Sequence, residues 1–281
     1  MSRTYPRLSI EEFGTHLFRT GDLDPVYVML HATPLPGPQL RRWLLAYWCF
    51  YDVGVASWMS EQPLFWENML EAGRNMTRSP IGERWPRGKE RRHFRGQQGI
   101  AALEYLQLVH PEPETFCAGL EGPWPDGSVT FEDVANKVRT YRGFGPWIAF
   151  KIADMLERVL NVNVTFDTAA IMMYDEPRKA AILLHHTLTG KKAAEDNEAI
   201  WFAVDYLKSY FGHLVAPPKD GRLVNIQELE TVLCKWKSHL GGHYPLNNDL
   251  HEVTETLKHW SGVSLTAKHL LSGLQSKTGR S

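Results

Sequence analysis

Apolar residues recur every three to four positions along most of this chain, a spacing that places them on one face of an α-helix. Capping residues stand directly before several of these stretches: Ser9 with Glu12, Thr130 with Asp133, and Asn225. Residues 161–166 carry a weak strand pattern that is too short to build a sheet. The pattern therefore predicts an all-α fold, with helices at about residues 9–20, from 24 onward, and at 39–59, 64–72, 98–109, 112–119, 131–141, 146–160, 178–188, 197–211, 226–240, 250–260 and 264–274.

Two proline-rich breaks indicate how the chain is divided. Residues 34–38 separate a helical N-terminal extension, 1–38, from a larger helical domain, 39–281. The break at 216–222 is either a boundary between two lobes, with a cleft between them, or a loop within one domain. Residues 39–59 form the strongest apolar stretch, and we expect them to be one long buried helix.

Composition narrows the class of protein. The 281 residues are 43% hydrophobic, no apolar run approaches the roughly 20 residues that span a bilayer, and the N-terminus lacks a signal-peptide pattern. Cys49, Cys117 and Cys234 lie far apart, which argues against a disulfide framework, a zinc knuckle or a four-cysteine iron–sulfur cluster. We therefore expect a soluble cytoplasmic protein without a bound metal and without a membrane partner. The net charge of −1 counts mildly against a general nucleic-acid binder.

The first candidate site is a glycine-rich segment between two predicted helices. Its residues are Arg142, Gly143, Phe144, Gly145 and Trp147, and the second helix begins at Pro146. Glycines allow a tight turn, and the amides at the start of the second helix could point at a DNA phosphate. Such a contact positions DNA without reading its sequence. The alternative is an ordinary glycine-rich turn between helices.

A single carboxylate, Asp167, follows this hairpin at a short distance in the sequence. Next to apolar Phe166, a carboxylate suits two chemical roles: it stabilises a developing cation, or it takes a proton from an incoming nucleophile. The alternative is that Asp167 only caps the next helix.

A basic loop is the second candidate site. Residues 84–95 hold six basic side chains and one acid, interleaved with aromatic residues. Arginine forks bind phosphate groups with two parallel hydrogen bonds, so this loop is predicted to bind phosphate. The alternative is a solvated surface loop. The candidate phosphate ligands are Arg87, Arg91, Arg92, His93 and Arg95.

Two further groups of residues are candidates for a pocket. Cys234, Trp236, Lys237 and His239 lie near the end of one predicted helix, and Tyr244 follows it. Their metal-ligating side chains are too few for a metal site, and the helix dipole already explains a Lys and a His in the last turn. Tyr51 and Asp52 interrupt an aromatic helix, where Asp52 either needs a buried partner or faces solvent. The sequence also lacks the phosphate-binding, dinucleotide-binding and zinc-protease motifs.

Together these segments resemble the amino acid:DNA transferases of phages, also described as α-glutamyl/putrescinyl thymine pyrophosphorylases, a branch of the helix-hairpin-helix DNA glycosylase superfamily. The resemblance covers about residues 40–250. It rests on Trp85-Pro86-Arg87 with Glu90-Arg91-Arg92-His93-Phe94-Arg95-Gly96, on Arg142-Gly143-Phe144-Gly145-Pro146-Trp147 with Asp167-Thr168, and on Cys234-Lys235-Trp236-Lys237-Ser238-His239 with Gly242 and Tyr244.

The resemblance implies a DNA substrate whose thymines carry a pyrophosphate ester on the 5-methylene group. An amine co-substrate, an amino acid or a polyamine, displaces the pyrophosphate from a base that has left the duplex stack. Asp167, Lys237 and His239 are then the candidate catalytic residues, and Lys237 or an arginine could pair with an amino-acid carboxylate. The resemblance also makes the phosphate ligands of the basic loop, Arg87, Arg91, Arg92, His93 and Arg95, the candidate pyrophosphate ligands. We expect no cofactor, with Mg²⁺ left open, and a location in the host-cell cytoplasm.

The lyase branch of the superfamily has a lysine where this chain has Trp147, and we expect Lys151, one turn further along, to face elsewhere. Schiff-base chemistry is therefore disfavoured. Two other functions stay open: a monofunctional DNA glycosylase that excises a modified base, and a DNA-binding module without catalysis. A glycosylase leaves abasic sites, whereas a transferase changes the mass of the base.

Overall fold

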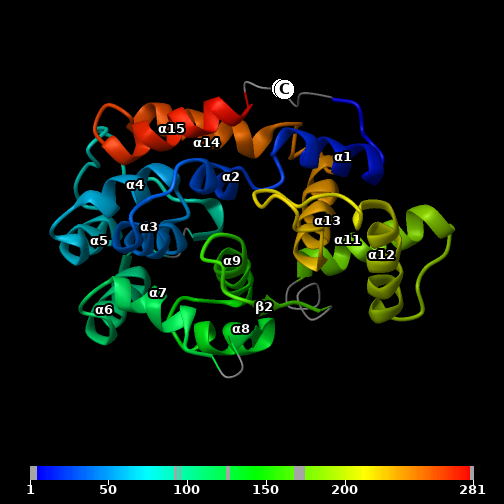
Figure 1. The fold of residues 1–281 in the computed structure, drawn as a ribbon, viewed down its shortest axis with the longest axis horizontal. Helices are drawn as coiled ribbons and strands as arrows, with labels where there is room; N and C mark the ends of the chain where they lie inside the picture. Colours follow the sequence, from blue (N-terminus) through cyan, green and yellow to red (C-terminus); the bar gives the residue numbers. More distant parts are fainter. Residues whose placement is uncertain (1–4, 92–93, 95, 125–126, 168–174, 279–281) are drawn as a thin grey trace.

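The computed structural model describes residues 5–91, 94, 96–124, 127–167 and 175–278, and the fold is all-α as predicted (Figure 1). Two short parallel strands, β1 (Val129–Thr130) and β2 (Val164–Thr165), form its sheet. The helices are α1 (Ile10–Thr20), α2 (Pro25–Ala32), α3 (Gly37–Phe50), α4 (Val53–Glu61), α5 (Phe65–Arg74), α6 (Gly96–Val109), α7 (Glu114–Glu121), α8 (Phe131–Arg139), α9 (Pro146–Arg158), α11 (Asp175–Thr189), α12 (Asp196–Phe211), α13 (Ile226–Leu240), α14 (Asn248–Trp260) and α15 (Leu265–Thr278), with a 3-10 turn, η1, at Lys89–Arg91.

The apolar side chains gather into two cores. The larger core is built from α2 to α9 together with α14 and α15, and we call this part the larger lobe. The smaller core is built from α1, α11, α12 and α13, which form the smaller lobe. Figure 1 shows the smaller lobe on one side, with α13 next to α9 of the larger lobe. The lobe interface therefore lies between α9 and α13.

This division differs from the predicted one at 1–38 and 39–281. Helix α1 packs on α13, whereas α2 packs on α15 and α14, so the first 38 residues contribute to both lobes. Ala216 and Val224 both belong to the smaller core, which makes the break at 216–222 a loop within one lobe. An amphipathic helix buries its apolar face wherever a partner face is available, and chain order does not reveal that partner.

The predicted single helix over residues 39–59 is wrong, because the structure has two helices, α3 and α4, with a break between them. Tyr51 ends α3 in the left-handed backbone region, with φ 53°. Asp52 then caps α4, and its side chain accepts a hydrogen bond of 2.8 Å from the Val55 amide. Asp52 is thus a helix cap, which gives its carboxylate a partner among these aromatic residues. Capping competes with helix continuation, and apolar periodicity does not detect it.

The two strands pair with each other at the open end of the hairpin, where α8 begins and α9 ends. β1 leads directly into α8, and β2 follows α9; Val129 pairs with Val164 and Thr130 with Thr165. The weak strand pattern at 161–166 is therefore confirmed as a two-residue strand. Phe166, the next residue, stacks on Phe131 with ring centroids 5.2 Å apart and contacts both cores. The strand pairing therefore sets the direction in which the chain continues from α9 to Phe166 and then to Asp167.

Candidate active site

A tight turn joins α8 to α9, as the glycine pattern predicts. Gly143 has φ +84°, and an added Cβ there would lie 2.9 Å from the Phe94 ring, so the position requires glycine. Gly145 caps α9 with φ −87°, is exposed, and has nothing within 4 Å of an added Cβ. The amides at the start of α9 therefore border solvent. This arrangement suits an anion at the helix start, and phosphate binding there stays a prediction.

Arg91 braces this turn from inside the protein. Its side chain is 1% exposed and donates hydrogen bonds to the carbonyl oxygens of Gly143 at 2.9 Å and Cys49 at 3.3 Å. Its guanidinium also lies 4.1 Å from the centroid of the Phe94 ring. Burial lowers the pKa of Arg91 to about 10, so the group keeps its charge at neutral pH. We therefore assign Arg91 to positioning the hairpin and not, as predicted, to pyrophosphate.

Arg87 is a second arginine that binds backbone carbonyl groups. It is half-buried and donates to the backbone carbonyl of Ala72 at 2.8 Å and to that of Phe94. These contacts correct its predicted pyrophosphate role in the same way, because its guanidinium already binds carbonyl oxygens. The other candidates of the basic loop, Arg92, His93 and Arg95, lie outside the described residues.

Asp167 stands at the edge of a cavity of about 260 Å³. It is exposed, and it directly follows Phe166, whose ring stacks on Phe131. Helix α12 supplies one face of the cavity with residues spaced three to four apart, among them Trp201, whose side chain is 57% exposed. The alternative role of Asp167, capping a following helix, depends on residues 168–174, which lie outside the described residues. The cavity is lined by Phe166, Asp167, Trp201, Val204, Asp205, Lys208, Asn225, Ile226 and Leu229.

One face of α9 carries polar side chains along an otherwise apolar helix. Trp147, Lys151, Asp154 and Arg158 follow the spacing of a single helix face, and this face meets α2 and α13 at the lobe interface. Lys151 was expected to face elsewhere than Trp147, the position of the lyase lysine, but the two residues lie one turn apart on the same face of α9. Trp147 contacts Tyr51 edge to face, with ring centroids 4.7 Å apart. The signal in the sequence was this spacing of charged residues within an apolar helix.

Arg158 is the centre of a buried ion cluster that joins the two lobes. Its side chain is fully buried and lies 2.6 Å from a carboxylate oxygen of Asp24, 3.6 Å from Asp154 and 3.3 Å from Glu228. Tyr27 donates a hydrogen bond of 2.8 Å to Asp154. Burial raises the pKa of Asp154 to about 7, although the neighbouring Arg158 lowers it. Asp24 belongs to the larger lobe and Glu228 to α13, so this cluster ties the lobes together.

Lys151 and Cys234 face the same interface from opposite helices. The Cys234 thiol donates to a carboxylate oxygen of Glu230 at 3.1 Å. Burial alone lowers the pKa of Lys151, but the carboxylates of Asp24 and Glu230, with Asp154, outweigh it and raise that pKa above its ordinary value. Lys151 is therefore a permanent cation at neutral pH. Cys234 lies at the lobe interface, and its place in a pocket stays a prediction.

The end of α13 has a structural role that differs from the predicted catalytic one. His239 is 1% exposed; its Nδ1 donates to the Tyr244 carbonyl at 2.8 Å, and its Nε2 accepts from the Leu8 amide at 3.3 Å. Trp236 is buried and donates to the Leu8 carbonyl at 3.2 Å. His239 and Trp236 therefore hold the N-terminal segment onto α13. His239 has both ring nitrogens occupied and no surface for a substrate, which corrects its catalytic assignment.

The remaining candidates of this segment are also paired. Lys237 forms an ion pair with Glu176 of α11, and that pair keeps its ammonium at the protein surface. Tyr244 is buried and donates to a carboxylate oxygen of Asp22 at 3.2 Å. The structure thus separates these residues from the Asp167 cavity, whose lining includes neither of them.

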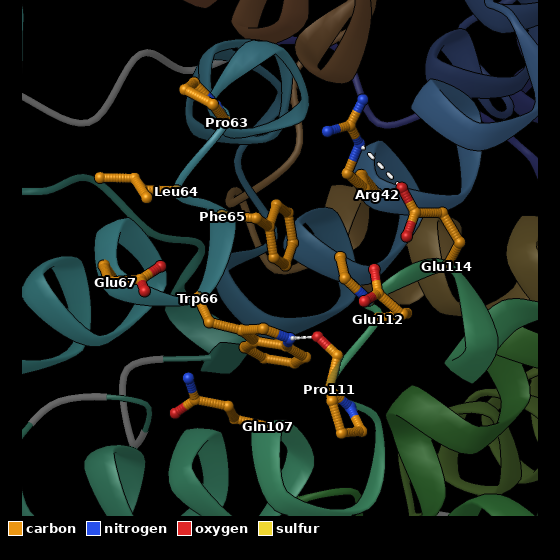
Figure 2. A pocket seen from close by; sticks show the side chains of 11 residues that line it. Arg42, Pro63, Leu64, Phe65, Trp66, Glu67, Gln107, Pro111, Glu112 and Glu114 are labelled. Atoms are coloured by element: carbon orange, nitrogen blue, oxygen red, sulfur yellow. Dashed lines mark hydrogen bonds and ion pairs between the residues drawn. The ribbon is translucent and has the colours of Figure 1, made fainter.

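A second cavity, of about 280 Å³, lies on the larger lobe and contains none of the predicted residues (Figure 2). Its polar groups bind one another: Arg42 lies 3.2 Å from a carboxylate oxygen of Glu114, and Trp66 donates to the Pro111 carbonyl at 3.0 Å. Within the described ranges, no group of three or more His, Cys, Asp or Glu side chains is placed to hold a metal ion. No described helix is long and apolar enough to cross a membrane.

Comparison with known proteins identifies the class. Residues 14–244 match the family described as amino acid:DNA transferase. The chain is 45% identical over 298 aligned positions to a glycinyltransferase of Pseudomonas phage PaMx11, covering 99% of this chain and 100% of that relative. It is 27% identical over 247 positions to a putrescinyltransferase of Delftia phage PhiW-14, covering 85% of this chain and 75% of the relative. The protein is thus a transferase that acts on DNA. It belongs to the amino acid:DNA transferase family.

Proposed function

We propose that this protein attaches an amino acid, through its amine nitrogen, to a thymine-derived base in DNA whose 5-methylene group carries pyrophosphate. A bond forms between the nitrogen and the methylene carbon, and the bond from that carbon to the pyrophosphate oxygen breaks. Its electron pair leaves with pyrophosphate. Membership of the amino acid:DNA transferase family supports the reaction class, and the glycinyltransferase, which matches along its full length, supports an amino acid such as glycine as the donor.

The observation that carries the proposal is the position of Asp167. The Asp167 side chain is exposed at the edge of a cavity, and Asp167 directly follows Phe166, whose ring stacks on Phe131 of α8. An amino acid arrives as an ammonium ion and must lose a proton before its nitrogen can attack, and a carboxylate within reach can accept that proton. The same charge stabilises the electron-poor methylene carbon as pyrophosphate departs.

The hairpin supplies the DNA contact in this proposal. The exposed amides around Gly145 and the positive end of α9 bind one phosphate of the DNA backbone, and Arg91 keeps the turn in shape from below. The target base leaves the stack to reach the cavity, because the 5-methylene carbon is otherwise open only to the major groove. Exposed Trp201 offers a flat face on which a base can stack.

Pyrophosphate release and glycosidic-bond cleavage, measured in the same reaction, test the proposal. The protein is incubated with glycine and with DNA that carries 5-(pyrophosphoryloxymethyl)uracil. We expect pyrophosphate to appear in step with glycine incorporation, only when both substrates are present, and without abasic sites. Free base together with abasic sites would overturn the proposal in favour of a glycosylase. DNA binding with neither product would leave a binding module.

A further inference from the structure

We propose that Lys151 holds the carboxylate of the incoming amino acid at the lobe interface and thereby selects amino acids over polyamines and simple amines. This inference rests on the proposed function, which it extends by naming the chemical class of the co-substrate and the residue that recognises it. Three observations support the inference: the position of Lys151 on α9, the ion pairs of the neighbouring cations, and the carboxylates that surround Lys151.

Lys151 projects from the α9 face that begins at the hairpin. Trp147 lies one turn before it on the same face and packs on Tyr51, and Asp154 lies one turn after it. The side chain is half-buried at the level where α9 meets α13. Phe150, its neighbour in sequence, contacts Phe166, which precedes Asp167. The turn of α9 that carries Lys151 is therefore also the turn that contacts the segment leading to Asp167.

The ammonium of Lys151 has no hydrogen bond and no ion pair with any described residue, although it contacts the Phe150 ring at 5.2 Å from the centroid. The other cations of this region are occupied. Lys235 lies 2.7 Å from Asp249 and also binds two carbonyl oxygens, and Lys237 is paired with Glu176. The carboxylates that raise the pKa of Lys151 act on it from beyond ion-pair distance. A ligand carboxylate can therefore make the direct ion pair that these carboxylates do not make.

The groups around Lys151 fit a zwitterion. Asp24 approaches from the start of α2, Asp154 from α9, and Glu230 with Cys234 from α13. The carboxylates attract the ammonium group of an amino acid, while Lys151 attracts its carboxylate. A diamine has no carboxylate, and its second ammonium group would meet the Lys151 ammonium as a like charge. The charge pattern therefore accepts glycine and disfavours putrescine.

The test compares glycine with methylamine, which is glycine without its carboxylate. Using the full chain and the pyrophosphorylated DNA, kcat and KM are measured for both amines in the wild type and in Lys151→Gln. We expect Lys151→Gln to raise KM for glycine by about tenfold or more, the effect of losing one charged hydrogen bond, with little change for methylamine. Lys151→Arg, which keeps the charge, should restore much of the glycine KM.

A matched control separates this site from the cavity beside Asp167. Lys208 lines that cavity, so it is the rival ligand for the carboxylate. The proposal is overturned if Lys208→Gln, and not Lys151→Gln, raises KM for glycine selectively. An equal loss for glycine and methylamine in Lys151→Gln would also overturn it, because that result indicates a structural role.

Two measurements keep the outcomes distinct. If circular dichroism shows that Lys151→Gln is unfolded, the test uses the wild type with glycinamide, which lacks the negative charge of glycine. The KM for glycinamide should then be about tenfold or more above that for glycine. Equal KM values would overturn the proposal. If the wild type transfers no amine at all, the proposed function itself fails. If it transfers glycine and methylamine equally well, only the assignment of Lys151 fails.

Discussion

Side chains of the same chemical type take different roles here because of where they are buried. Arg91 and Arg158 are both enclosed, one bound to backbone carbonyls and the other to carboxylates, and neither borders solvent. Asp167 is exposed at a cavity, and Lys151 lies half-buried at the lobe interface. Burial therefore separates the residues that hold the structure from those that can meet a substrate.

Replacing Asp167 with Asn tests the residue that carries the proposed function. Asn keeps the size of the side chain but removes the charge and the proton acceptor, so we expect the rate of transfer to fall by about a hundredfold or more. DNA binding should persist, because the hairpin is unchanged. Asp220→Asn, at an exposed loop position, is the control and should leave the rate intact. Near-normal turnover in Asp167→Asn would remove Asp167 from the mechanism.

The raised pKa of Asp154 makes a prediction about stability and pH. Burial raises this pKa from 3.8 to about 7 in the folded protein, so the folded state binds the proton more tightly than the unfolded state. The contribution of Asp154 to the free energy of unfolding is therefore full below pH 4 and decreases as the pH rises toward 7. In Asp154→Asn this decrease should be absent, as measured by urea unfolding at a series of pH values. Identical pH profiles for the two proteins would contradict the assignment.

At the scale of single elements, the sequence predicts helix starts better than it predicts helix contacts. The capping boxes at Ser9 and Thr130 are present, and the glycine-rich turn falls between α8 and α9 as predicted. These features depend on residues close in sequence. The break at Tyr51 is not visible in the pattern, because periodicity within the apolar stretch continues through it. Local pattern also does not show whether an arginine points outward or inward, and Arg87 and Arg91 both bind backbone carbonyls inside the protein.

The two hairpin glycines should respond differently to substitution. In Gly143→Ala the added Cβ meets the Phe94 ring and the left-handed backbone disfavours a side chain, so we expect a loss of stability of about 1–2 kcal/mol. Gly145→Val adds bulk in open space at the start of α9 and should leave the melting temperature nearly unchanged.

DNA affinity distinguishes the phosphate contact from packing. We expect Gly145→Val to weaken binding by about tenfold, and equally for unrelated DNA sequences, because a backbone phosphate contact carries no sequence information. Fluorescence anisotropy with two unrelated duplexes measures this. Unchanged affinity in Gly145→Val would contradict the proposed contact between the hairpin and a phosphate.

At the scale of the whole molecule, two hydrophobic cores meet across a charged interface. The class of the fold and the family could be predicted from the sequence, since both depend on local pattern and on motifs. The assembly of the lobes could not be, because α1 joins α13 while α2 joins α14 and α15. The cluster around Arg158 likewise gathers Asp24, Asp154 and Glu228 from three separate segments.

Arg158 is predicted to be a major determinant of stability. Arg158→Met leaves three buried carboxylates without their shared cation, and we expect the free energy of unfolding to fall by about 3–5 kcal/mol. Arg222, which also lies 3.0 Å from Glu228 but is 17% exposed, is the control, and Arg222→Met should cost less. Urea denaturation of both variants measures the difference. Equal losses would show that the buried cluster does not dominate the lobe interface.

Nucleoside mass spectrometry tests the central claim most directly: the protein adds an amino acid to a base that stays attached to its sugar. DNA bearing 5-(pyrophosphoryloxymethyl)uracil is incubated with the protein and a mixture of amino acids and polyamines, then digested to nucleosides. We predict a new nucleoside in which the 5-methylene carbon carries the nitrogen of an amino acid such as glycine. Free base with abasic sites, or a substrate nucleoside that stays unchanged with every amine, would contradict the claim.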